Sequence, residues 1–392
     1  MKILCITGTR ADYGIYRPLL HAIENDSELD LGMIVTGMHL LREYGMSIEQ
    51  IQKDGHLIVA SPGILTKGDT TASMSQAAGL FLLYCADIFA CQKPDFILLL
   101  GDRLEMLAAA IAAHYQNIGI IHLHGGEISG SADDLIRHAI SRLSHLHFVA
   151  TLQAKERLQT WGEDAWRINA VGSLRKTDID RIINLDEFLK KAYRKKYFSH
   201  LCKKTILLVI HPDSKDAVPF HLQISTVLRA LHSLDAGIII VGSNSDAGGG
   251  IFAQYIRQFV QENNSTQFFP TIPHDEYLYL LQHVDVIVGN SSSGIIEAPF
   301  FSLPCINIGL RQNGREKAAN VTDVGYDSKV IRKTLLSILQ RTSRLIVSNP
   351  YNLNKSPATE IMKTIKNLFR HPKLLDKQYS TNTGPGRHPN NA

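Results

Sequence analysis

The densest group of residues able to do chemistry lies between His122 and His138, where the sequence reads HLHGGEISGSADDLIRH. Histidine and carboxylate side chains exchange protons near neutral pH or bind metal ions, and arginine binds anions. Glu127 and Asp133 are the carboxylates best placed for proton transfer in this stretch. The stretch therefore predicts a site for acid and base chemistry.

The elements around this stretch place its polar residues between a strand and a helix. The preceding apolar run, IGIIHL, predicts a buried strand, and the apolar residues after it follow a helical spacing. Ser131 followed by Asp134 resembles a capping box, so we expect the helix to begin near Ala132. Asp133 would then lie in the first turn, with Arg137 one turn further along the same face.

Two histidine pairs raise the alternative of a metal site. His122 and His124 would point to the same side of the strand, and together with Asp102 they could ligate zinc or another divalent ion. The same spacing recurs at His145 and His147. Because the chain has 17 histidines, chance pairs are common. We expect hydrogen-bonded, non-ligating histidines and no metal.

Strands and helices alternate through most of the 392 residues, which predicts an α/β fold. The first alternation starts with the apolar run at 2–7, and the second begins at 205, after polar and basic helices. We expect two Rossmann-like, doubly wound domains facing across a cleft, at 1–172 and 173–370. Residues 371–392 have little to bury and predict a mobile tail.

Charged residues follow the predicted strands of the first domain. The turn after the first strand contains Arg10 and Asp12, and a later apolar run ends in Gly101, Asp102 and Arg103. Arg10 could meet an anionic ligand or form a surface ion pair with Asp12. Neither the G-x-G-x-x-G pattern nor a P-loop is present, so no nicotinamide cofactor or ATP is indicated.

The second domain contains GNSSSGIIEAP between a predicted strand and a helix expected to start near Ile295. Free N–H groups and the hydroxyls of Ser291, Ser292 and Ser293 could bind a diphosphate, or the serines could merely cap the helix. Glu297, on the first turn, could accept hydrogen bonds from ribose hydroxyls.

Further ionisable groups are predicted at the same rim of the second domain. His211 follows its first strand, while Arg311 and Arg315 follow a later one. The residues alone thus predict binding of a nucleoside diphosphate compound. The four candidates for proton transfer are Asp102, Glu127, Asp133 and His211.

Composition excludes several other classes of protein. The net charge is only +4 and no basic stripe with aromatics is present, which argues against nucleic acid as a partner. The basic run at 190–204 predicts a solvated helix face or linker, although it could touch a phosphate-rich surface. Five cysteines without a C-x-x-C pair suit free thiols in the cytoplasm. We expect no signal peptide and no apolar run long enough to span a membrane.

Six motifs, in the order GTRADYG, GDR, HLHGGEISGSADDLIRH, IHPD, GNSSSGIIE and GLRQNGRE, resemble the hydrolysing UDP-N-acetylglucosamine 2-epimerases. The resemblance implies a glycosyltransferase-B-type fold and conversion of UDP-N-acetylglucosamine and water to UDP and N-acetylmannosamine. It also implies a role at the start of sialic-acid-type sugar biosynthesis, a homodimer or homotetramer, and no metal or cofactor.

The implied mechanism is anti elimination of UDP to a 2-acetamidoglucal, followed by addition of water. Because C2 is deprotonated on one face and reprotonated on the other, two proton carriers are needed. By resemblance Asp102, Asp133 and His211 are catalytic and Arg137 positions them. The UDP-binding residues implied in the same way are Arg10, Arg103, Ser291, Ser292, Ser293, Glu297 and Arg311.

One residue departs from the family pattern. The N-acetylglucosamine enzymes usually carry a glutamate where this chain has His124, and that residue is a candidate proton carrier. Histidine at this place resembles the UDP-N,N'-diacetylbacillosamine 2-epimerases of legionaminic acid synthesis, which are the alternative. Three further alternatives are a sugar transferase, a non-hydrolysing epimerase and a non-catalytic sugar-nucleotide sensor. A transferase should carry an apolar or basic membrane-docking patch on its first domain, and the sequence shows no convincing one. The GDR and GGE motifs resemble the hydrolysing enzymes, and Asp102, Asp133 and His211, which a sensor would not need, are all present.

Overall fold

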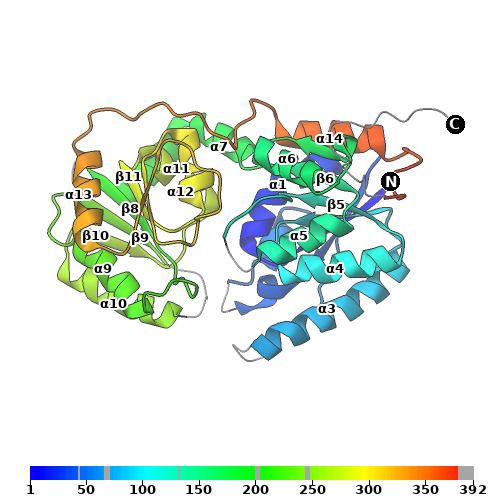
Figure 1. Cartoon of the computed structure of the whole chain (residues 1–392), viewed down its shortest axis with the longest axis horizontal. Coiled ribbons are helices and arrows are strands. Elements are labelled where there is room, and N and C mark those ends of the chain that lie inside the picture. Colours follow the sequence, from blue (N-terminus) through cyan, green and yellow to red (C-terminus); the bar gives the residue numbers. More distant parts are fainter. Residues whose placement is uncertain (43–44, 66–70, 131–132, 199–203, 243–247, 378–392) are drawn as a thin grey trace. The chain divides into compact units, whose positions relative to one another are not determined.

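The computed structural model describes residues 1–42, 45–65, 71–130, 133–198, 204–242 and 248–377. The chain forms two compact units, each with its own sheet and core (Figure 1). Unit 1 contains the described parts of residues 1–127, 132–174 and 353–392. Unit 2 contains those of residues 128–131 and 175–352.

Unit 1 is built on a seven-stranded parallel sheet with the order β3-β2-β1-β4-β5-β6-β7. β1 lies between β2 and β4, with Cys5 opposite Met33 and Leu98. The strand order reverses beside β1, and open α/β sheets bind ligands at such a switch point. The strands are β1 Lys2–Thr7, β2 Asp30–Val35, β3 Ile58–Ala60, β4 Phe96–Leu100, β5 Gly119–Leu123, β6 Leu146–Val149 and β7 Ile168–Ala170.

Helices cover both faces of this sheet. One core cluster joins the sheet to α1 and α14, and another joins it to α3, α4 and α5. At the start of α1 the Thr9 hydroxyl accepts a hydrogen bond from the N–H of Asp12 at 3.2 Å, as an N-cap does. The helical elements of unit 1 are α1 Arg10–Glu24, η1 Gly37–Leu40, α2 Ile48–Lys53, α3 Thr71–Gln92, α4 Leu104–Tyr115, α5 Asp134–Leu143, α6 Leu152–Thr160, η3 Ala165–Arg167 and α14 Pro357–Leu368.

Helix α3 contradicts the expectation that no apolar run could span a membrane. Residues 72–92 are long and apolar enough by length and composition, and an 18-residue window within them has a mean hydropathy of 1.4. One side of α3 carries Phe81, Cys85 and Phe89 into the same core cluster as α4. Leu83, on another side, is 67% exposed. The helix therefore packs against the core of unit 1 with one side and leaves another side exposed.

Unit 2 contains a six-stranded parallel sheet with the order β10-β9-β8-β11-β12-β13. Its order reverses beside β8, which gives a second switch point between β8 and β11. The strands are β8 Thr205–Val209, β9 Gly237–Val241, β10 Thr266–Phe269, β11 Val286–Gly289, β12 Cys305–Ile308 and β13 Val321–Val324. The helical elements are α7 Lys176–Ile183, α8 Glu187–Phe198, α9 Phe220–Leu231, α10 Gly249–Glu262, α11 His274–His283, α12 Ser293–Ile296, η4 Ala298–Phe301 and α13 Ser328–Leu339.

Glycine at the end of β11 is required by strand pairing. Gly289 has φ +135°, and a Cβ atom there would lie 2.0 Å from the carbonyl oxygen of Val209 on β8. Only glycine lets the two backbones approach this closely. The first glycine of the GNSSS motif is thus a structural residue of the switch point.

The chain end departs from the predicted domain limits. The chain passes from unit 1 to unit 2 after Leu174, close to the predicted boundary at 172. Helix α14, however, belongs to unit 1, where Ile361 and Ile365 are buried in the core. Figure 1 shows α14 in orange beside the blue and green elements of unit 1. Leu374 is buried in the same core, so residues 371–377 are packed rather than a mobile tail. The remainder of the predicted tail, 378–392, lies outside the described residues.

Candidate active site

Arg137 is the centre of the polar cluster in unit 1. Its side chain is only 4% exposed and projects from the first turns of α5. The guanidinium hydrogen-bonds the Asp102 carboxylate, the Asp134 carboxylate at 2.9 Å and the carbonyl oxygen of Glu127 at 2.9 Å. One buried arginine therefore joins the loop after β4, the loop after β5 and helix α5, as its predicted positioning role requires.

The start of α5 differs from the prediction. The helix begins at Asp134, two residues later than expected, and Asp133 is its exposed N-cap residue rather than part of the first turn. The predicted capping residue Ser131, like Ala132, lies outside the described residues. Asp133 remains beside Asp134 at the positive end of the helix dipole, which favours the ionised carboxylate.

His124 and Glu127 form a pair in the loop after β5. His124 Nδ1 lies 2.8 Å from Glu127 Oε1, and the two side chains are 13% and 7% exposed. The Nε2 atom of His124 is buried and has no hydrogen-bond partner among the described residues. A carboxylate that accepts from Nδ1–H fixes the tautomer in which Nε2 is free to accept a proton.

His124 does not lie on the strand, contrary to the prediction. β5 ends at Leu123, and His124 has φ +62°, a left-handed conformation that is uncommon for a residue with a side chain. Backbone strain of this kind concentrates at functional sites.

The contacts of His122 contradict the metal alternative. Its Nδ1 lies 3.1 Å from Ser141 Oγ and its Nε2 lies 2.8 Å from the Gly101 carbonyl oxygen, so both ring nitrogens are hydrogen-bonded. Burial lowers the pKa of His122 to about 3, which keeps the ring neutral. His145 also has a protein partner, because its Nδ1 accepts the N–H of Ile120 at 3.0 Å.

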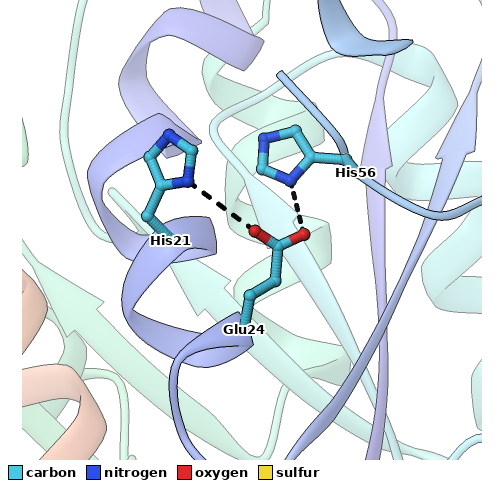
Figure 2. A group of neighbouring side chains, drawn as sticks. All are labelled: His21, Glu24 and His56. Atoms are coloured by element: carbon cyan, nitrogen blue, oxygen red, sulfur yellow. Dashed lines mark hydrogen bonds and ion pairs between the residues drawn. The ribbon is translucent and has the colours of Figure 1, made fainter. Parts of the chain in front are cut away.

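Among the described residues, one group brings histidine and carboxylate ligand atoms within 4.8 Å of one another: His21, Glu24 and His56 (Figure 2). Figure 2 shows each imidazole facing a different oxygen of Glu24. The distances are 2.6 Å from His56 Nδ1 and 3.7 Å from His21 Nδ1. The carboxylate of Glu24 is thus hydrogen-bonded to His56 and lies in a longer ion-pair contact with His21, and the group contains none of the predicted site residues.

The paired glycines after His124 serve packing. A Cβ atom on Gly125 would lie 2.7 Å from His122 Nδ1, and one on Gly126 would lie 2.7 Å from the Ala154 carbonyl oxygen. Gly126 also has φ +72°. A side chain at either position would collide with protein atoms. Packing within the protein therefore explains both glycines without a ligand.

Arg10 and Arg103 follow β1 and β4, the two strands beside the switch point. Arg10 is the first residue of α1. Its guanidinium lies against Gly45, because a Cβ atom added there would be 2.5 Å from Arg10 Nη2. Arg103 Nε lies 3.4 Å from Glu105 Oε2, and Glu105 is 1% exposed. Burial raises the pKa of Asp12 to about 6, although the charge of Arg103 opposes it.

In unit 2, the side chain of Asn290 fixes the backbone at His211. Its Oδ1 accepts the N–H of His211 at 2.7 Å and its Nδ2 donates to the His211 carbonyl oxygen at 2.8 Å. Burial, followed by the charge of Arg311, lowers the pKa of His211 to about 3. His211 is therefore neutral at pH 7, and its burial and Arg311 disfavour the protonated ring.

The serine loop is more internally bonded than predicted. The backbone N–H groups of Asn290, Gly294 and Ile295 already donate to protein carbonyls, so fewer of them are available to a diphosphate. The hydroxyl of Ser293 bonds to that of Ser291 at 3.0 Å and to Tyr277 at 2.6 Å. The helix after this loop begins at Ser293, two residues before the predicted start near Ile295. Ser292 is its N-cap, and α12 has only four residues.

Glu297 and the two arginines follow this loop. Glu297 ends α12 instead of starting it, and its Oε1 lies 3.5 Å from Arg175 Nε. Arg311 donates to the Asn290 carbonyl oxygen at 3.2 Å, which brings it to His211 and the serines as predicted. Arg315 Nε donates to Gln312 Oε1 at 2.8 Å, so it supports the neighbouring loop.

Several residues that shape the site were missed in the sequence. Glu105 lies two residues after the GDR motif, and its place in the first turn of α4 was a usable signal. No local sequence signal indicated Tyr277 or Arg175. Their partners, Ser293 and Glu297, lie elsewhere in the sequence. Long-range pairing of this kind cannot be read from local spacing.

Comparison with known proteins identifies the family. The sequence profile described as UDP-N-acetylglucosamine 2-epimerase matches residues 21–366. A UDP-N,N'-diacetylbacillosamine 2-epimerase (hydrolyzing) of Legionella pneumophila is 37% identical over 376 residues, which cover 96% of this chain and 98% of that protein. A UDP-N-acetylglucosamine 2-epimerase of Neisseria meningitidis is 34% identical over 334 residues, covering 84% and 85%.

A solved structure supports the fold. The crystal structure of UDP-GlcNAc 2-epimerase from Neisseria meningitidis bound to UDP-GlcNAc has a TM-score of 0.78 at 16% identity, covering 94% of this chain and 100% of that chain. The expected glycosyltransferase-B-type architecture of two parallel-sheet α/β units is confirmed. The chain belongs to the UDP-N-acetylglucosamine 2-epimerase family.

Proposed function

We propose that this enzyme is a hydrolysing 2-epimerase that releases UDP from a UDP-2-acetamido sugar, with UDP-N,N'-diacetylbacillosamine as its substrate. The observation that carries the choice of sugar is His124, which stands where the N-acetylglucosamine enzymes carry glutamate. Two relatives named for the diacetylbacillosamine reaction, each 37% identical, support it. This reverses the order of the two substrates expected from the motifs.

The first half-reaction is elimination. A base removes the proton from C2 of the sugar, the bond from C1 to the diphosphate oxygen breaks, and a C1–C2 double bond forms. Neutral His211 and the carboxylates of Asp102 and Asp133 are the candidate proton acceptors. Arg137 holds Asp102 in place through their hydrogen bond.

The second half-reaction is hydration. Water adds its oxygen to C1, and C2 receives a proton on the face opposite to the one that lost it, which inverts C2. The His124–Glu127 pair is suited to carry one of these protons, because Nε2 has no hydrogen-bond partner in the described part of the chain while Nδ1 is held at 2.8 Å from the carboxylate. Glu127 would also stabilise the imidazolium formed when Nε2 takes up a proton.

The departing UDP needs cations and hydrogen-bond donors more than a proton, because its own pKa is low. Arg10 and Arg103 at one switch point and Arg311 at the other are the candidate cations. Ser291 and Ser292 are the candidate donors to the diphosphate. Glu297, held by Arg175, would accept from ribose hydroxyls.

The test compares UDP-N,N'-diacetylbacillosamine with UDP-N-acetylglucosamine under identical conditions in D2O. We expect release of UDP with the higher kcat/KM for the diacetamido sugar, and one deuterium at C2 of the free product. UDP release only from UDP-N-acetylglucosamine would instead support the second candidate, for which the 34% identity to the Neisseria meningitidis enzyme speaks. An intact UDP-sugar epimer as the product, or no UDP release from either sugar, would overturn the hydrolysing reaction.

A further inference from the structure

The last described segment of the chain, His371–Lys377, is fixed to unit 1 by one arginine. We call this segment the strap. The Arg167 side chain is 1% exposed and donates to the carbonyl oxygens of Leu374 at 2.7 Å, Lys373 at 2.8 Å and Asp376 at 3.0 Å. The Leu374 side chain is buried in the core of the unit. These contacts hold the strap in one position on unit 1.

The strap ends at Lys377, which meets the carboxyl end of α5. Its Nζ atom donates to the carbonyl oxygens of Ser141 at 3.2 Å, Arg142 at 2.9 Å and Ser144 at 2.6 Å. The last carbonyls of a helix have no partner within it, and a cation there also complements the helix dipole. Lys377 therefore caps α5 from a distant part of the chain.

The positive charge of Lys377 is compensated in the interior. Its side chain is 9% exposed, and Nζ lies 2.8 Å from Oε2 of Glu163, which is 1% exposed. The same carboxylate oxygen lies 3.2 Å from His147 Nε2. Burial lowers the pKa of Lys377 to about 8, while Glu163 opposes that shift. A lysine this buried is rare unless it is paired.

Helix α5 links Lys377 to the polar cluster. Lys377 holds its carboxyl end, while its amino end follows Asp133 and carries Arg137, which binds Asp102. A helix of ten residues moves largely as one body, so loss of the cap would shift or loosen Arg137.

We propose that Lys377 is a positioning residue for the reaction, acting through α5 on Arg137 and its carboxylate partners. The effect on turnover rests on the proposed function, whereas the effect on α5 does not. Nothing in the local sequence around Lys377 indicates this role. Its basis is the convergence of three helix-end carbonyls and one buried carboxylate on one ammonium group.

The experiment compares Lys377→Met with Lys377→Arg and with Lys373→Met. Lys373 lies in the same strap with an exposed side chain, so Lys373→Met is the matched control. For each full-length variant, kcat, KM and UDP affinity are measured, together with hydrogen exchange of the backbone amides of α5 and of β8 in unit 2. Glu163→Gln removes the ion partner and repeats the test should Lys377→Met not fold.

In Lys377→Met we expect kcat to fall by about tenfold to a hundredfold, with KM and UDP affinity nearly unchanged, because the groups that do chemistry lose their alignment. Amides of α5 should exchange faster while those of β8 do not. Lys377→Arg should retain most of kcat, and Lys373→Met all of it. Unchanged exchange in α5, an equal effect of Lys373→Met, or a loss in KM alone would overturn the proposal. If the wild-type enzyme turns over neither sugar, the proposed function fails, and hydrogen exchange in α5 still decides the role of Lys377.

Discussion

At the scale of single residues, the site in unit 1 combines an arginine that binds carboxylates with a histidine paired to a third carboxylate. Arg137 binds the carboxylates of Asp134 and Asp102, so it orders the cluster. His124, by contrast, has one ring nitrogen held by Glu127 and one without a hydrogen-bond partner among the residues that the structure describes. Glu127 is thus the carboxylate partner of His124, and the two residues are tested together.

Glu127→Gln tests the pair directly. The amide keeps the shape of the side chain but removes the charge that stabilises the imidazolium, so we predict a fall in kcat of about a hundredfold or more. UDP affinity should change little, because Glu127 is not among the residues expected to bind UDP. Steady-state UDP release and calorimetric binding of UDP measure the two quantities. Glu156→Gln, on the exposed side of α6, is the control, and a normal kcat in Glu127→Gln would remove the pair from the mechanism.

At the scale of elements, the sequence predicted the strands well and the loop geometry poorly. β1 has the predicted bounds, and charged residues do follow β1, β4, β5 and β8, because buried parallel strands leave a clear apolar pattern. The left-handed turn at His124 and the internal bonding of the serine loop left no such pattern. Each is also held by a residue that is not adjacent in the sequence: the backbone N–H of His124 donates to the Phe148 carbonyl oxygen, and Tyr277 bonds to Ser293.

Histidines buried at the strands predict how stability changes with pH. Burial lowers the pKa of His122 and His211 to about 3 and that of His39 and His145 to about 4. In the unfolded chain these rings titrate near 6.5, so below that pH the unfolded chain binds more protons than the folded one. The free energy of unfolding should therefore fall as pH decreases from 6.5 to 4, and level off above 6.5.

Urea unfolding between pH 4 and 8 measures this dependence. Each buried histidine contributes a slope of up to about 1.4 kcal/mol per pH unit within the window. His211→Asn removes one of the titrating groups, so the slope below pH 6.5 should be smaller than in the wild-type protein. An equal slope in the two proteins would mean that His211 is protonated in the folded state at these pH values.

At the scale of the whole molecule, the order of the chain does not match the order of its units. The chain leaves unit 1 after Leu174 and returns to it at Leu353, so that α14 and the strap complete the unit that the first residues began. Sequence alone could not assign α14, because its amphipathic pattern fits the core of either sheet equally well. Stability of unit 1 consequently depends on residues that follow all of unit 2.

Ile361→Ala and Ile338→Ala distinguish this arrangement from a simple tandem of domains. Ile361 on α14 is buried in the core of unit 1, and Ile338 on α13 is buried in that of unit 2. Each truncation should cost about 2–5 kcal/mol in its own unit through lost apolar contact and the cavity left behind. Native-state hydrogen exchange of the β1 and β8 amides reports on the two units separately. We predict that Ile361→Ala lowers protection mainly in β1 and Ile338→Ala mainly in β8. If Ile361→Ala instead lowered protection in β8 and not in β1, α14 would belong to unit 2 in solution. The strap that follows α14 would then not be held where Lys377 contacts α5.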